Sequence, residues 1–356
     1  MQIALIGLSQ SGKSTLFAAA TGKAYDPVAA GAGQAERAVV KVPDERLNVL
    51  ADMYKPKKIT HATIDFLDVP GLSFVDEALR AEARKIVAQV RNTDMLVLVI
   101  CGFANPSVAA YRDRVNPVAD LEELRSELLL ADLELIENRI EKLEKSVHKP
   151  SKTQDQDKKE LALLLRCREA IENEQPLSSV IEGEEERVVR SFGFLTLKPM
   201  LIVENIAENK IGSAGVMGTE AAGTAVIALS APIEAELAGL EDDDRAVFME
   251  DLGVREIARD QLVQQCYTAC KLVSFLTTGE DEVRAWTIPA ECPAVEAAGA
   301  IHSDIQRGFI RAETVAYQDL IGAGDMKSAK AAGKIRLEGK TYAVQDGDII
   351  NFRFNV

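Results

Sequence analysis

Apolar positions in the first 120 residues alternate between short strand-like runs and amphipathic, helix-like stretches. The run 95–101 is apolar throughout, which is typical of a strand buried inside a parallel sheet. A helix-like stretch over 75–91 precedes it, and two further apolar strands follow much later in the chain. We therefore predict an α/β domain with a parallel sheet. The predicted strands cover residues 3–6, 38–42, 63–67, 95–101, 199–203 and 224–229.

Between the two parts of this pattern lies a long polar segment with coiled-coil spacing. From residue 121 to 147, apolar residues recur at alternating intervals of four and three. A polar break at 148–155 separates this helix from a second one predicted over 158–173. We expect an antiparallel helical hairpin inserted into the α/β domain. The apolar seam consists of Leu129, Leu133, Ile136, Ile140, Leu143 and Val147.

The tip of this hairpin and its flanks are rich in lysine. Two interpretations stay open, a solvated loop and a projecting contact arm. The lysines are Lys142, Lys145, Lys149, Lys152, Lys158 and Lys159.

The last part of the chain has a different pattern. Residues 283–288 read as a strand, 293–301 as a short helix, and 340–354 as two strands around an Asp-Gly turn. Strands around a helix in under ~100 residues predict a ubiquitin-like β-grasp domain. The predicted domains are the α/β domain (1–120 and 190–275), the hairpin (121–175) and the β-grasp domain (277–356).

Composition narrows the class of protein. The 356 residues are 47% hydrophobic and 27% charged, which is ordinary for a soluble globular protein, and the longest apolar run is far shorter than the ~20 residues of a membrane span. A net charge of −15 argues against broad, non-specific nucleic-acid binding but leaves room for local basic patches. Five cysteines without paired or metal-like spacing fit a reducing compartment. We expect a cytoplasmic protein with no membrane association.

The first predicted strand leads directly into a phosphate-binding motif. Residues 7–14 read G-x-x-x-x-G-K-S, and a helix-like run follows. Glycines let such a loop curl until its backbone N–H groups converge on phosphate oxygens, at a helix N-terminus that favours negative charge. Lys13 would reach the β- and γ-phosphates, and the Ser14 hydroxyl would ligate Mg²⁺. The candidate nucleotide-binding residues here are Gly7, Ser9, Gln10, Ser11, Gly12, Lys13, Ser14 and Thr15.

A second motif, D-x-x-G, ends the third predicted strand. Asp68 would hold Mg²⁺ through its water shell, and the Gly71 N–H would sense the γ-phosphate. Lys13, Asp68 and Gly71 are therefore the candidate catalytic residues, and Ser14 and Asp68 the candidate metal ligands. Leu72 stands where Ras-like enzymes place a water-orienting glutamine. We expect slow hydrolysis that needs backbone groups, a bound cation such as K⁺, or a partner to place the water.

A third motif follows the strand at 199–203. Asn205, Ile206 and Glu208 form N-x-x-E, where GTPases have N-K-x-D and use the aspartate to bind guanine. Adenine has no N1–H and no 2-amino group for a carboxylate, so the loss of that aspartate removes the reason to prefer guanine. Ser230 and Ala231 end the next strand, where GTPases place a turn that contacts the base.

Together these motifs resemble the YchF (Obg-like ATPase) subfamily of translation-factor-related P-loop proteins, over nearly the whole chain. The resemblance implies a Ras-like P-loop NTPase domain with an inserted hairpin and a C-terminal TGS domain of the β-grasp type. It also implies Mg²⁺, ATP in preference to GTP, and binding to the ribosome or its large subunit and RNA through the hairpin and the TGS domain. Besides N-x-x-E, the segments that carry it are 42–47, 127–134, 230–237, 283–288, 298–302, 308–313 and 336–356.

This chain departs from the family in its switch regions. The family usually has Pro-Asn-Val where this chain has Ser9, Gln10 and Ser11, and its first switch carries a threonine, whereas this chain has none between Thr21 and Thr60. Phosphate binding should survive because Lys13 and Ser14 remain, while switching and hydrolysis should be weaker. The main hypothesis is a slow ATPase whose nucleotide state controls binding to the translation machinery. The alternatives are a nucleotide-sensing ribosome-binding module with little hydrolysis and a GTP-binding protein.

Overall fold

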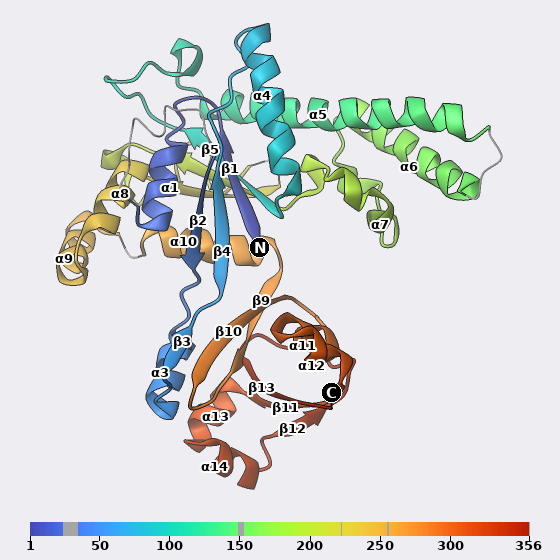
Figure 1. Ribbon diagram of the computed structural model, residues 1–356. Helices are drawn as coiled ribbons and strands as arrows, with labels where there is room; N and C mark the ends of the chain where they lie inside the picture. The colour runs from blue at the N-terminus through green and yellow to red at the C-terminus, as the bar shows by residue number, and fades with distance from the viewer. Residues whose placement is uncertain (24–34, 149–152, 222, 255, 356) are drawn as a thin grey trace. The chain divides into compact units, whose positions relative to one another are not determined.

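The structure is a computed structural model, and it divides into two compact units (Figure 1). The first unit comprises residues 1–38 and 66–258, and the second comprises 39–65 and 259–356. The residues that the structure describes are 1–23, 35–148, 153–221, 223–254 and 256–355. Residues 24–34, which are part of the stretch between Thr21 and Thr60 where the first switch is expected, and the tip residues Lys149 and Lys152 therefore lie outside the described residues.

A seven-stranded sheet forms the centre of the first unit, in the order β2-β4-β1-β5-β6-β8-β7. Neighbouring strands from β1 to β8 along this order run parallel, and the short β7 pairs antiparallel with β8. This is the parallel sheet that the apolar runs predict, and the expected fold class is confirmed. The strands are β1 (Gln2–Gly7), β2 (Glu36–Lys41), β4 (Thr63–Asp68), β5 (Met95–Cys101), β6 (Met200–Asn205), β7 (Glu220–Ala221) and β8 (Thr224–Leu229).

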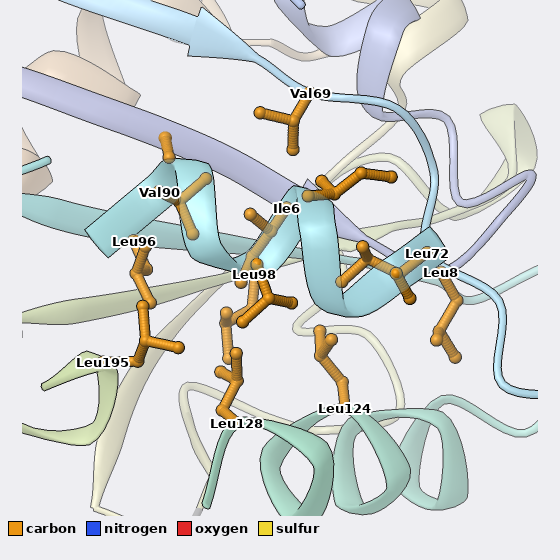
Figure 2. Packing of buried hydrophobic residues seen from close by; sticks show 14 of the residues in the cluster. Ile6, Leu8, Val69, Leu72, Val90, Leu96, Leu98, Leu124, Leu128 and Leu195 are labelled. Carbon is orange, nitrogen blue, oxygen red and sulfur yellow. The ribbon is translucent and has the colours of Figure 1, made fainter. Parts of the chain in front are cut away.

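Helices of the first unit pack on this sheet or extend away from it. Helix α1 contacts α8, while α4 and α5 contribute to a core on one sheet face. In Figure 2, Leu124 and Leu128 of α5 lie against Leu96 and Leu98 of β5. The helices are α1 (Lys13–Thr21), α4 (Glu77–Gln89), α5 (Pro117–Ser146), α6 (Gln154–Glu172), α7 (Glu185–Val189), α8 (Ala231–Gly239) and α9 (Asp242–Leu252).

The predicted hairpin consists of α5 and α6, which run side by side in Figure 1. Arg139 of α5 pairs with Glu160 of α6 at 2.7 Å, and Ser146 donates to Asp157 at 3.2 Å, so residue numbers rise along one helix as they fall along the other. The two helices are therefore antiparallel. Ile136 and Ile140 of the predicted seam are buried in a core that the hairpin shares with buried residues of the segment 177–194.

The second unit has a six-stranded sheet in the order β12-β11-β13-β9-β10-β3. Its strands are β3 (Lys58–Thr60), β9 (Leu272–Thr277), β10 (Glu282–Pro289), β11 (Phe309–Ala316), β12 (Arg336–Glu338) and β13 (Asp348–Phe354). Its helices are α3 (Glu45–Tyr54), α10 (Ala258–Ala269), α11 (Ala294–Ile301), α12 (Ser303–Arg307), α13 (Tyr317–Ala323) and α14 (Met326–Ala331). β13 runs parallel to β9 in the middle of the sheet, with α11 packed in the same core, as in a β-grasp fold.

Two sequence expectations differ from this arrangement. Strands β2 and β4 lie in the seven-stranded sheet as expected, but α3 and β3 between them belong to the second unit, where β3 pairs with β10 and extends its sheet. The first of the two strands expected within 340–354 is also wrong. Ala343 forms only an isolated bridge to Pro293, and Val344 N–H donates to Cys292 O at 3.0 Å, so this segment follows the start of α11 and not a neighbouring strand.

Within the part of the chain that the structure describes, no helix has both the length and the apolar character needed to cross a bilayer.

Candidate functional site

The phosphate-binding loop connects β1, which ends at Gly7, to α1, which begins at Lys13. Gly12 has a left-handed backbone with φ of 85°, and a Cβ atom there would lie 2.1 Å from Asn205 Nδ2. Only glycine fits this position. Gln10 is exposed and also left-handed, with φ of 68°, a conformation that is uncommon outside glycine and clusters at functional sites.

Lys13 and Asp68 form a buried ion pair at the start of α1. Both residues are less than 9% exposed, and the Lys13 Nζ donates to Asp68 Oδ1. The Ser14 Oγ lies 3.4 Å from the same Nζ. Two motifs that are 55 residues apart thus bring a cation, a carboxylate and a hydroxyl to one point.

The donor set at this point fits Mg²⁺. Hydroxyl and carboxylate oxygens are the ligands that this hard cation takes, usually one or two from the protein with water and phosphate oxygens completing its shell. Ser14 and Asp68 offer one oxygen group each. Among the described residues, no cluster of three or more His, Cys, Asp or Glu could hold a metal by itself.

The D-x-x-G loop is bonded directly to the phosphate-binding loop. Leu72 N–H donates to Gly7 O at 2.9 Å, and Ser9 N–H donates to Leu72 O at 2.8 Å. A Cβ atom on Gly71 would lie 3.0 Å from Ser9 Cα, so the two loops pack backbone to backbone. Any rearrangement of one loop therefore has to disturb the other.

The Leu72 side chain points into the core. It is fully buried, and Figure 2 shows it beside Leu8. A buried aliphatic side chain cannot hold a water molecule for attack on a phosphate. In this structure the position that follows Gly71 contributes to packing.

Asn205 joins the phosphate-binding loop to the turn after β8. Its side-chain amide donates to Ser11 O at 3.1 Å and accepts from Ala231 N–H at 2.9 Å, and the residue is almost fully buried. Ile206 is buried too, and its N–H donates to Leu229 O.

The other residues at the expected base-contacting end are placed differently. Ser230 is buried, and its hydroxyl makes no hydrogen bond within the described residues; the same holds for the Ser11 hydroxyl. Glu208 is exposed at the start of a short 3-10 helix, Glu208–Lys210. The structure thus brings Asn205, Ser11 and Ala231 together and leaves the Glu208 carboxylate at the surface.

A cavity of about 370 Å³ lies along the phosphate-binding loop. The end of β5 and the following loop form much of its wall. Its lining includes Gln10, Ser11, Asn205, Phe103, Val108 and Tyr111.

Tyr111 and Arg112 form a polar network beside this cavity that the sequence patterns do not predict. Tyr111 Oη accepts from Phe74 N–H at 3.2 Å, and Arg112 donates to Phe74 O at 3.3 Å. The same two side chains bind Glu123 of α5, at 3.1 Å and 2.7 Å. Burial by itself would raise the pKa of Glu123, but hydrogen bonds from Arg112 and Tyr111 outweigh it and lower that pKa. The segment after the D-x-x-G motif is thereby tied to the base of the hairpin.

Sequence signals for this network are weak, because its residues lie in an irregular loop. Arg112 and Asp113 both have left-handed backbones, with φ of 52° and 54°. Neither is glycine or asparagine, so no turn signature marks the position. The contacts with Phe74 and Glu123 hold a backbone that the local sequence does not favour.

Comparisons with known proteins agree on one family. A family model described as 50S ribosome-binding GTPase matches residues 2–136, and the model YchF-GTPase_C, described as a protein of unknown function (DUF933), matches residues 272–355. The chain is 40% identical to a Bacillus subtilis protein named ribosome-binding ATPase YchF, over 99% of this chain and 98% of that one. An Escherichia coli O157:H7 protein of the same name is 36% identical, with the same coverage.

Solved structures agree with the sequence relatives. The Schizosaccharomyces pombe YchF GTPase superposes with a TM-score of 0.82 at 26% identity, covering 99% of this chain and 97% of that one. A GTP-binding protein from Pyrococcus horikoshii, at 17% identity and a TM-score of 0.62, shares the fold.

Proposed function

The chain belongs to the YchF (Obg-like ATPase) family, and from that premise we propose that it is a Mg²⁺-dependent ATPase that binds ATP in preference to GTP and hydrolyses it slowly. The observation that carries this proposal is the buried Lys13–Asp68 pair with Ser14 beside it. In P-loop enzymes these three groups hold the β- and γ-phosphates and the metal. The names of the YchF relatives support ATP as the substrate.

Each residue of the cluster has a role in this proposal. The backbone of residues 9–14 surrounds the phosphates, and Lys13 neutralises charge that develops on the transferred group. Ser14 and Asp68 would hold Mg²⁺, which would supply further neutralisation of phosphate charge. The Lys13 ammonium group has three N–H donors, so it can bind phosphate oxygens while it keeps a bond to Asp68.

Slow turnover is expected from the position of Leu72. Its side chain is buried, so the attacking water must be placed by backbone groups, by a bound cation such as K⁺, or by a partner. A nucleotide-sensing module with little hydrolysis is the second candidate, favoured by this same observation. Single-turnover hydrolysis with Mg²⁺ and K⁺, with and without ribosomes, separates the two. A rate no faster than spontaneous ATP decay would favour the module.

We further propose that the ribosome, through its large subunit and RNA, is the partner and that the protein works in the cytoplasm. The relatives are named for ribosome binding, and the hairpin presents exposed lysines near its tip, among them Lys142, Lys158 and Lys159. These cations offer a local basic surface on a chain with a net charge of −15. The C-terminal TGS-like unit is the second proposed contact.

Neutralising Lys142, Lys158 and Lys159 to glutamine should weaken co-sedimentation with ribosomes, most clearly at low salt. Lys23 and Lys55, which are exposed outside the hairpin, give matched control substitutions. Equal sedimentation of the hairpin variant and the parent would remove the hairpin from the binding surface.

The direct test of the proposed function is equilibrium binding of ATP and GTP to the purified chain with Mg²⁺. We expect tighter binding of ATP. A preference for GTP would mean that Glu208 does not select the base as proposed. Weak binding of both nucleotides would point to a degenerate site on a ribosome-binding scaffold.

A further inference from the structure

The connection between the parallel strands β6 and β8 contains no α-helix among its described residues. Parallel neighbours are usually joined by a crossover that contains an α-helix. Between residues 206 and 223 the described residues instead form a 3-10 helix, Glu208–Lys210, a series of turns and the two-residue strand β7. Without a helix, the backbone groups of this connection need other partners.

Glu204, in the second-last position of β6, supplies such a partner. It is fully buried, and its carboxylate accepts from Val216 N–H and from Met217 N–H, both at 2.9 Å. Within the described part of the chain, none of the ion pairs involves this carboxylate. The carboxylate therefore accepts its hydrogen bonds from backbone N–H groups. Hydrogen bonds to an ionised carboxylate are stronger than those between neutral groups.

Two glycines make room for the Glu204 carboxylate. A Cβ atom on Gly215 would lie 2.4 Å from Glu204 Oε2, and one on Gly102 would lie 2.8 Å from Oε1. Gly215 also has a left-handed backbone, with φ of 68°. The chain approaches this side chain from two directions at positions where a larger residue would not fit.

These contacts close a loop. The chain leaves β6 after Asn205, passes through turns in which Lys210 N–H donates to Ala207 O and Ser213 N–H donates to Lys210 O, and returns to the Glu204 carboxylate at residues 216–217. Glu208 lies within this closed loop. The neighbouring Asn205 fixes the phosphate-binding loop at the same strand end.

We propose that Glu204 is a positioning residue for base recognition, because it closes the loop that carries Glu208. The proposal rests on the proposed function, in which Glu208 faces the base of the nucleotide. Closing the loop limits the conformations that Glu208 samples before binding, and ordering a loop in advance strengthens the contact that it makes. Glu204 itself stays buried and does not contact the nucleotide.

Glu204→Gln tests the proposal. The glutamine amide has nearly the same size, but it is uncharged and has one oxygen, so it cannot accept from both N–H groups as the two carboxylate oxygens do. We expect the ratio of ATP to GTP affinity to fall by about tenfold, the order expected for a lost hydrogen bond to a charged group. Binding of inorganic tripolyphosphate should not change, because Lys13 and its loop are untouched. Amide exchange at Val216 and Met217 should become faster.

Glu122→Gln on the exposed face of α5 is the matched control, with the same change of charge and atoms. It should leave all three measurements as in the parent. Gly215→Ala perturbs the same contact, because the added methyl group would lie against the Glu204 carboxylate. It provides the test if Glu204→Gln does not fold.

A double-mutant cycle shows whether Glu204 acts through Glu208. In a Glu208→Ala background, Glu204→Gln should produce no further loss of ATP selectivity. An unchanged affinity ratio in Glu204→Gln, or an equal loss in both backgrounds, would overturn the proposal. A parent protein that binds ATP and GTP equally would contradict the proposed function instead, and exchange at Val216 and Met217 would then decide alone whether Glu204 closes the loop.

Discussion

The phosphate end and the base end of the candidate site are built in different ways. At the phosphate end, Lys13 and Asp68 are buried and bonded to each other, and the backbone of Leu72 is bonded to Gly7 and Ser9. At the base end, Asn205 is buried and doubly bonded, but Glu208 is exposed on a loop that β6 holds through Glu204. In the proposed function, affinity for phosphate would thus rest on buried, mutually bonded groups, and selection of the base would depend on a loop.

The two ends of the candidate site should therefore tolerate amino-acid substitutions to different degrees. A change at the phosphate end alters a buried charge or a core contact, so stability and binding should fall together. A change in the loop that carries Glu208 should alter selectivity with little loss of stability. Four substitutions test this comparison, in order of expected effect.

Lys13→Ala should have the largest effect. It removes the cation proposed to bind the phosphates and leaves the Asp68 carboxylate buried without its partner. We expect turnover to fall by about a hundredfold or more, and the free energy of unfolding to fall by about 3–5 kcal/mol. ATP binding, single-turnover hydrolysis and urea unfolding measure these losses.

Lys23→Ala is the control for that substitution, because Lys23 follows the same helix and makes an exposed ion pair with Glu36. It should change neither activity nor stability appreciably. If Lys13→Ala retained the parent's ATP affinity and turnover, the assignment of the phosphate site would be wrong.

Asn205→Ala should weaken the contacts at both the phosphate end and the base end of the candidate site. It removes the donor to Ser11 O and the acceptor of Ala231 N–H, and it leaves both backbone groups buried without that partner. The expected loss in the free energy of unfolding is about 1–3 kcal/mol, with weaker binding of both ATP and tripolyphosphate. Asn209→Ala, at an exposed position of the same connection, is the control. Unchanged tripolyphosphate binding would show that Asn205 does not support the phosphate end.

Leu72→Gln introduces the glutamine that Ras-like enzymes use at this position to orient water. Since Leu72 is fully buried in the core, we expect a loss of about 1–3 kcal/mol in the free energy of unfolding and no gain in hydrolysis rate. Leu72→Met keeps the volume and the apolar character and should be nearly neutral. Faster single-turnover hydrolysis by Leu72→Gln, at unchanged stability, would contradict the placement of this side chain.

Glu208→Asp should have the smallest effect. It shortens an exposed side chain by one methylene and restores the acid found in N-K-x-D, so we expect the ATP to GTP affinity ratio to move towards GTP by less than about tenfold. Thermal unfolding should match that of the parent, because Glu208 makes no core contact. An unchanged ratio would count against contact between Glu208 and the base.

The local pattern of the sequence was sufficient for most elements. The apolar run of β5, the four-three spacing of α5 and the glycines around the phosphate-binding loop each reflect interactions between residues close in the chain. The antiparallel hairpin and the parallel sheet followed from these local patterns. The seam residues Ile136 and Ile140 are buried as their spacing predicts.

Only the tertiary structure decided which distant residues meet. Asn205 bonds to Ser11 across 194 positions of the chain. In the polar network beside the cavity, Tyr111 and Arg112 connect Phe74 to Glu123. Glu204 lies just beyond the predicted strand 199–203, and its contacts appear only where residues 216–217 return to it. Periodicity and turn chemistry report what a segment does with its own neighbours, whereas a buried polar contact depends on how separate segments fold against one another.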